Sequence, residues 1–119
     1  MQGLMQEWPL LCHKIIDYAA QQHGDREIVS RSIEGPITRS NYSTIRTNSL
    51  RVAQALDRSG YMLGDRIATL AWNTDRHMEC WYGIMGMGAV CHTLNPRLTA
   101  VQIAWMLPEY RDRMIDSTS

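Results

Sequence analysis

The stretch Gly64–Leu98, GDRIATLAWNTDRHMECWYGIMGMGAVCHTLNPRL, has the pattern of one strand–helix–strand unit. Arg66–Trp72 is a short apolar run that predicts a buried strand, and Asn73 or Thr74 then offers a side-chain oxygen to cap a helix. Ala89–Leu94 returns to the spacing of a strand. Because a helix separates the two strands, we expect them to lie parallel in an α/β fold.

The helix inside this unit carries a stripe of large apolar side chains. They fall at i, i+3, i+4 and i+7, as Met78, Trp81, Tyr82 and Met85. A stripe at this spacing is more often the buried face of a helix than the lining of a ligand pocket. We therefore expect these residues in the core and assign none of them to substrate contact.

The chain before Gly64 predicts two more helices and a hairpin. Pro9–His23 has apolar side chains at helical spacing, at Leu11, Ile15, Tyr18, Ala19 and Gln22, and Gly24 suits a left-handed closing residue. Arg26–Ser32 and Ile37–Ser40 are short strands around a Glu34-Gly35-Pro36 turn, which predicts a hairpin.

A second helix is expected to begin at a cap on Ser40 or Asn41 and to run through Arg58, with Gly60 ending it. Its expected buried face is Ile45, Val52, Ala53 and Leu56.

After Leu98, Thr99 is a natural N-cap for another helix. That helix carries Val101, Ala104 and Trp105 on one side, and we expect Pro108 to stop it, because proline removes a donor and clashes with the carbonyl four residues earlier. Arg113–Ser119 has the pattern of the start of a further strand.

Three motifs carry a family resemblance. Gly64-Asp65-Arg66-Ile67-Ala68, Gly86-Met87-Gly88-Ala89-Val90 and above all His92-Thr93-Leu94-Asn95-Pro96-Arg97-Leu98 resemble the N-terminal part of AMP-forming acyl-CoA synthetases, closest to the medium- and long-chain fatty-acid CoA ligases. The resemblance covers nearly the whole chain and weakens after Leu107. It implies the N-terminal subdomain of that fold: a βαβ unit, a hairpin and flanking helices, incomplete at the C-terminus, with residues 1–119 forming a single partial domain.

The resemblance also implies a parent reaction. Such enzymes adenylate a fatty acid with ATP and Mg²⁺ and transfer the acyl group to coenzyme A. Their Ser/Thr/Gly-rich phosphate loop, adenine-binding motifs and C-terminal lysine have no match here, and Lys14 is the only lysine. We therefore expect no catalytic, cofactor-binding or metal-binding residue in this chain, and a role as structural scaffold of a ligase. A non-catalytic interaction or dimerisation module of the same descent is the alternative.

The C-terminal end departs from the family pattern, and a truncation, a frameshift near Leu107 or an incomplete gene model would each explain it. A fragment that ends inside a parallel sheet leaves strand edges uncovered, so we expect self-association.

The composition excludes several classes of function. Twelve basic residues balance twelve acidic ones, so no net field attracts nucleic acid. Three cysteines at wide spacing are a poor disulfide framework, and Glu7 and Pro9 interrupt the segment in which a secretory signal would lie. No apolar window is long enough to span a membrane. The expected location is the cytoplasm.

Two histidine–cysteine pairs could suggest a zinc site. His77 precedes Cys80 by three residues, and Cys91 adjoins His92. Structural zinc sites use paired ligands with short regular spacing, and neighbouring residues of a strand face opposite ways. We therefore expect no metal site, and cysteines that are buried structural residues rather than nucleophiles.

The remaining candidates also have structural explanations. Gly83, Gly86 and Gly88 lie inside and after a helix, where no dinucleotide loop occurs, and close helix–strand packing explains them. The carboxylates Glu7, Asp17, Asp25 and Glu27 form no acid–base pair. In the Asn95-Pro96-Arg97 turn, we expect Asn95 to bond local backbone and Arg97 to pair with a carboxylate.

Overall fold

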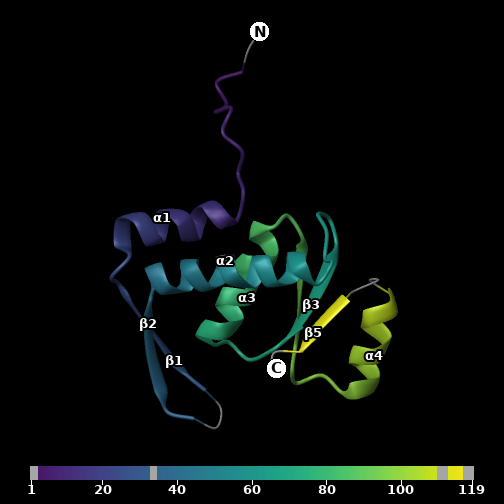
Figure 1. Cartoon of the computed structure of the whole chain (residues 1–119). Coiled ribbons are helices and arrows are strands. Elements are labelled where there is room, and N and C mark those ends of the chain that lie inside the picture. Colours follow the sequence, from purple (N-terminus) through teal and green to yellow (C-terminus); the bar gives the residue numbers. More distant parts are fainter. Residues whose placement is uncertain (1–2, 33–34, 110–112, 117–119) are drawn as a thin grey trace.

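The computed structural model describes residues 3–32, 35–109 and 113–116. Four helices and five strands follow one another along this part of the chain (Figure 1): α1 His13–His23, β1 Glu27–Arg31, β2 Ile37–Asn41, α2 Tyr42–Arg58, β3 Arg66–Leu70, α3 Asp75–Gly86, β4 Val90–Leu94, α4 Ala100–Glu109 and β5 Arg113–Asp116. The strands form two sheets, an antiparallel β1–β2 pair and a parallel sheet in the order β4–β3–β5. The predicted α/β fold with a βαβ unit and a hairpin is confirmed.

The parallel sheet is centred on β3. Ile67 pairs with Cys91 of β4 on one side and with Arg113 of β5 on the other. Three consecutive residues of β3 are buried, Ile67, Ala68 and Thr69, as expected for a strand covered on both faces. The strand expected after residue 112 is therefore present over Arg113–Asp116, and residues 117–119 lie outside the described part of the chain.

Helices α2, α3 and α4 begin where their caps predict. The Asn41 side chain accepts a hydrogen bond from the Thr44 amide at 2.8 Å, and Thr74 accepts from the His77 amide at 3.3 Å. At the start of α4, Gln102 and Thr99 bond reciprocally: the Thr99 amide donates to Gln102 Oε1 at 3.0 Å, and the Gln102 amide donates to Thr99 Oγ1 at 3.4 Å. This is the arrangement of a capping box.

The core lies between β3, α2 and α3. It is a cluster of Leu56, Ile67, Ile84 and Ala89. Helices α2 and α3 cross closely beside it (Figure 1). Gly83 makes this crossing possible, because a Cβ there would lie 2.8 Å from both the Ser49 carbonyl oxygen and Val52 Cβ. The expectation that this glycine serves helix–strand packing was wrong, since it lets two helices approach each other.

Gly88 serves a turn instead. It lies two residues after the end of α3 and has a φ of 84°, in the left-handed region that favours glycine.

Helix α1 differs from the prediction in three ways. It begins at His13 rather than Pro9. Gly24 has a φ of −52° rather than a left-handed conformation, and a Cβ there would collide with Ser43 Oγ. The glycine therefore provides close contact with the start of α2. The buried side of the helix is marked by Ile16, whereas Leu11, Ile15 and Tyr18 are exposed.

The expected faces of α3 and α4 also need correction. In α3 the buried residues are Glu79, Gly83 and Ile84, and Trp81 of the predicted stripe is 43% exposed. In α4, Val101 and Trp105 are exposed, and the helix continues through Pro108 to Glu109. Pro108 lies in the last turn, where only the carbonyl four residues earlier loses its helical partner.

No helix among the described residues has both the length and the apolar character that crossing a bilayer requires.

Candidate functional site

The carboxyl ends of β3 and β4 meet at one edge of the parallel sheet, and a cavity of about 590 Å³ opens there. Its lining combines the segments that follow the two strands with one residue of the hairpin: Arg31, Ala71, Trp72, Asn73, His77, Thr93, Leu94, Asn95, Pro96 and Arg97. In open α/β sheets, ligands bind in crevices at this edge, where successive connections leave the sheet in opposite directions.

The Asn95-Pro96-Arg97 turn forms one wall of this sheet-edge cavity. Asn95 Oδ1 accepts a hydrogen bond from the Arg97 amide at 3.0 Å, and the Asn95 carbonyl accepts from the Leu98 amide at 3.1 Å. The predicted local bonding of Asn95 is confirmed. The Arg97 guanidinium, however, lies over the Trp72 ring, 5.7 Å from its centroid, instead of pairing with a carboxylate. An aromatic face holds this cation in place without neutralising its charge.

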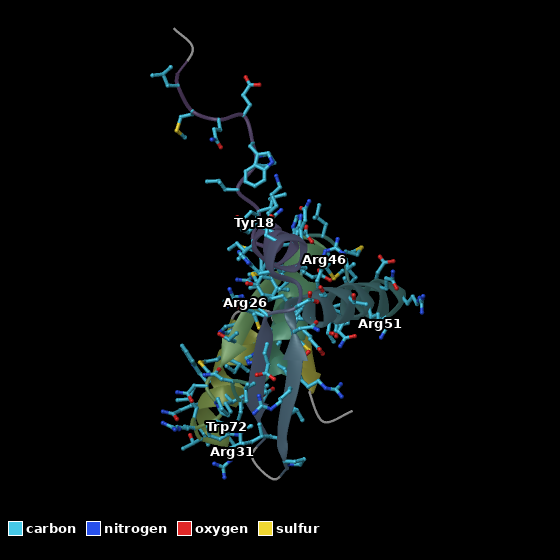
Figure 2. The ribbon with its side chains drawn as sticks, turned by 90° about the vertical axis from the view of Figure 1, so that its left-hand side faces the viewer. Tyr18, Arg26, Arg31, Arg46, Arg51 and Trp72 are labelled. Atoms are coloured by element: carbon cyan, nitrogen blue, oxygen red, sulfur yellow. The ribbon has the colours of Figure 1, made fainter. Side chains whose placement is uncertain are left out.

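The hairpin contributes a second cation, Arg31. Figure 2 shows Arg31 and Trp72 at the same end of the molecule. The hairpin is held there by buried Ser30, whose Oγ accepts a hydrogen bond from the Asp75 amide at 3.1 Å. The salt bridges among the described residues are Arg39–Glu27 at 2.6 Å and Arg46–Asp17 at 2.7 Å. Neither Arg31 nor Arg97 takes part in them, so both can bind an anionic group.

A second, more apolar cavity of about 460 Å³ adjoins the first. It lies between β1 and the start of α3, and Ile28, Val29, Met78 and Trp81 are among its lining residues. Asn73, His77 and Thr93 line both cavities. Two residues of the predicted core stripe, Met78 and Trp81, therefore face a groove. Their helical spacing could not predict that they line a cavity, because the spacing does not show which face of the helix the hairpin leaves uncovered.

His77 stands between the two cavities. Its Nε2 atom lies 2.9 Å from Thr69 Oγ1 of the buried strand β3. Burial lowers the pKa of His77 from its ordinary value of 6.5, and a hydrogen bond with the Trp72 backbone acts in the opposite sense. The imidazole is therefore neutral at physiological pH and available for hydrogen bonding rather than for charge.

The lowered pKa of His77 predicts a pH dependence of stability. The unfolded chain binds this proton at a higher pH than the folded chain does, so the contribution is complete above about pH 6.5 and is lost as the pH falls through the lowered pKa. We expect the melting temperature to decline on acidification more steeply for the native chain than for a His77→Asn variant. A proton NMR titration of the His77 ring provides the direct check, and a midpoint at or above 6.5 would contradict the assignment.

Neither Cys80 nor Cys91 has the lowered pKa of an activated thiol. Burial raises the pKa of Cys91 to about 11, although a hydrogen bond with the Thr69 side chain acts in the opposite sense. Burial also raises the pKa of Cys80. Both thiols are half-buried, whereas Cys12 is exposed, against the expectation of buried cysteines. Across the described residues, no group of three or more histidine, cysteine or carboxylate side chains could hold a metal ion.

One buried charged group was missed by sequence reasoning. Glu79 is 7% exposed, and its Oε1 accepts a hydrogen bond from Asn48 Nδ2 at 2.7 Å across the α2–α3 contact. Its position four residues before Gly83, on the same side of α3, was the available signal. Glu79 does not line the sheet-edge cavity, so its role is to join the two helices.

Comparison with solved structures identifies the class of enzyme that has this fold. The fold is that of the N-terminal part of AMP-forming synthetases. The N-terminal domain of FACL13 from Mycobacterium tuberculosis matches with a TM-score of 0.78 at 24% identity, over 87% of this chain and 26% of that one.

The sequence assigns the family. Residues 16–115 match the model of the AMP-binding enzyme family, and the chain belongs to that family. It is 44% identical over 115 residues to the 3-methylmercaptopropionyl-CoA ligase of Ruegeria lacuscaerulensis. It is 38% identical over 115 residues to the medium-chain-fatty-acid–CoA ligase of Ectopseudomonas oleovorans. Each of these two alignments includes 97% of this chain and 21% of the relative, so the chain spans about a fifth of the length of these ligases. The predicted relationship to acyl-CoA synthetases is confirmed.

Proposed function

We propose that this chain is the N-terminal α/β part of an acyl-CoA ligase, which activates a carboxylic acid with ATP and joins the acyl group to coenzyme A. The observation that supports this most strongly is the identity of 38–44% over 115 residues to ligases that form CoA thioesters. We propose a medium- or long-chain fatty acid as the substrate, in line with the fatty-acid ligases among the relatives. Relatives named for 3-methylmercaptopropionate make a shorter acid the competing choice.

Within such a ligase we propose that this part acts as scaffold and supplies one wall of a binding surface. The sequence contains no glycine-rich phosphate loop, and the described residues contain no cluster suited to Mg²⁺, so the adenylation chemistry would belong to other parts of such a ligase. The sheet-edge cavity does suit a phosphate-bearing group, because Arg31 and Arg97 both line it. ATP and coenzyme A both carry such groups. We propose a cytoplasmic location, and with no net charge nothing favours nucleic acid as a partner.

A non-catalytic interaction module is the second candidate. The exposed apolar side chains at the start of the chain, such as Leu10 and Ile15, favour it. The two candidates differ in whether this sequence can still serve a working ligase.

A graft of this chain into a related ligase distinguishes the two candidate functions. The chain replaces the equivalent segment of the Ectopseudomonas oleovorans medium-chain ligase, and fatty-acid-dependent ATP–pyrophosphate exchange is measured for the graft and for the isolated chain. We expect exchange from the graft and none from the isolated chain. Arg97→Glu in the graft should reduce acyl-CoA formation, because a negative charge replaces one of the two positive charges that line the sheet-edge cavity. Exchange from the isolated chain would contradict its assignment as scaffold.

A further inference from the structure

His77 bonds two separate parts of the chain with one side chain. Its Nε2 atom lies 2.9 Å from Thr69 Oγ1 on β3, and the ring also forms a hydrogen bond with the backbone of Trp72. This second bond raises the pKa of His77, so a ring N–H donates and the Trp72 carbonyl accepts. The ring therefore joins the buried strand to the segment that follows it.

These two contacts determine which ring nitrogen carries the proton. Because Nε2 faces the Thr69 hydroxyl, Nδ1 is the atom that donates to Trp72. In the neutral ring, Nε2 then accepts a hydrogen bond from that hydroxyl. Thr69 is itself held firmly, because it is buried in β3 and its side chain also bonds with the Cys91 thiol of β4. The sheet thus fixes the ring, and the ring anchors Trp72.

Trp72 needs such an anchor because it lies in the connection between β3 and α3 (Figure 2). It is 43% exposed, so the surrounding residues pack around only part of its side chain. Its ring nevertheless supports the guanidinium of Arg97, 5.7 Å from the ring centroid. A cation–π contact depends on the place of the ring. The bond from His77 to the Trp72 backbone therefore affects the position of Arg97.

The backbone of Arg97 is fixed without His77. Its amide donates to Asn95 Oδ1 at 3.0 Å, which sets the course of the turn. The guanidinium, however, lies at the end of a long side chain with much rotamer freedom. The contact with the Trp72 ring restricts that freedom. Holding the cation in place before a ligand arrives lowers the entropy cost of binding an anion.

We propose that His77 is a positioning residue of the sheet-edge cavity, which holds Trp72 in place so that Arg97 is presented to an anionic ligand. His77 lines this cavity, but both of its ring nitrogens bond within the chain, so it acts through Arg97. The proposal rests on the proposed ligase function for its kinetic test alone. The contacts themselves can be tested in the isolated chain.

Proton NMR of the isolated chain tests these contacts directly. In the native chain, the ring current of Trp72 should shift the side-chain protons of Arg97 upfield, and His77→Ala should remove most of this shift. His77→Asn should preserve it, because the Asn amide takes the place of Nδ1 and still donates to the Trp72 carbonyl. The matched control is Ser49→Ala, which removes a buried 2.7 Å hydrogen bond to the Ile45 carbonyl within α2 and should leave the shift unchanged.

Kinetics of the graft into the Ectopseudomonas oleovorans ligase give the functional readout. Arg97→Gln should raise the KM of one phosphate-bearing substrate, ATP or coenzyme A, by about tenfold and leave kcat nearly unchanged, because a binding contact is lost. His77→Ala should raise the same KM by about fivefold. The double variant should show no further increase over Arg97→Gln alone, because His77 acts through Arg97.

The outcomes distinguish this role from a purely structural one. Additive increases in KM for the double variant would overturn the proposal, as would Arg97 shifts that His77→Ala leaves unchanged. An effect of His77→Asn as large as that of His77→Ala would contradict the bond to Trp72. A graft without activity would contradict the proposed ligase function, and the NMR result would still decide the role of His77. Circular dichroism confirms that each variant is folded.

Discussion

Replacing Gly83 by alanine is expected to destabilise the chain by about 2 kcal/mol, whereas the same replacement at Gly86 is expected to stabilise it by up to about 1 kcal/mol. At Gly83 the new Cβ would lie 2.8 Å from the Ser49 carbonyl oxygen and from Val52 Cβ. Neither atom is the end of a flexible side chain, so α2 and α3 would have to move apart. This cost exceeds the gain in helix propensity that alanine brings.

Gly86 is the matched control because it lies in the same helix, three residues later. The closest atom to a Cβ there is His13 Cβ at 3.8 Å, an ordinary van der Waals contact. The two free energies of unfolding, measured in urea at one protein concentration, should therefore change in opposite directions. Equal changes of the same sign would mean that α2 does not approach α3 at Gly83.

Truncating Ile84 to alanine is the second large effect, with an expected loss of about 2–5 kcal/mol. The side chain is fully buried and belongs to the cluster with Leu56, Ile67 and Ala89. Removing three carbons leaves a cavity that the strand and two helices around it can close only in part. This loss is a large part of the ~5–15 kcal/mol that stabilises a typical domain.

Val101→Ala is the control for this truncation, because Val101 is 80% exposed on α4. It should change the stability by no more than about 0.5 kcal/mol. Urea unfolding of both variants, followed by circular dichroism, provides the comparison. A change below about 1 kcal/mol for Ile84→Ala would contradict the position of the core between β3, α2 and α3.

Local signals predicted the order of the elements well. The apolar run before Trp72, the cap at Thr74 and the cap at Thr99 each act within a few residues of the chain, and each lies where it was expected. The parallel pairing of β3 and β4 followed from the helix between them. These features depend on short-range chemistry, which a single sequence contains.

The buried faces of the helices could not be predicted in this way. Helix α3 carries apolar residues on more than one side, and Gly83 decides which side packs, because only a residue without Cβ admits α2 so closely. In α1, Ile15 and Ile16 are adjacent, and only the position of α2 determines that Ile16 is the buried one. Burial here is a property of tertiary contacts.

In the candidate site, too, the local features were predictable from the sequence and the long-range contacts were not. The Asn95-Pro96-Arg97 turn stood out in the sequence, and the local bonding of Asn95 is as expected. The other residues that line this cavity were not predictable. Arg31 reaches it from the hairpin, and a hydrogen bond between Ser30 and Asp75, which are 45 residues apart in the sequence, holds the hairpin in place. The Trp72 ring over which Arg97 lies likewise comes from another part of the chain, the segment that follows β3.

Acyl-CoA formation by the graft tests the central claim most directly. The chain replaces the equivalent segment of the medium-chain ligase, with which it shares 38% identity over 115 residues. Thioester production from a fatty acid, ATP and coenzyme A is then measured beside the unaltered ligase. If this chain is the N-terminal α/β part of an acyl-CoA ligase, the graft forms the thioester. A folded graft that forms none, with its melting temperature unchanged, would contradict that claim and favour an interaction module.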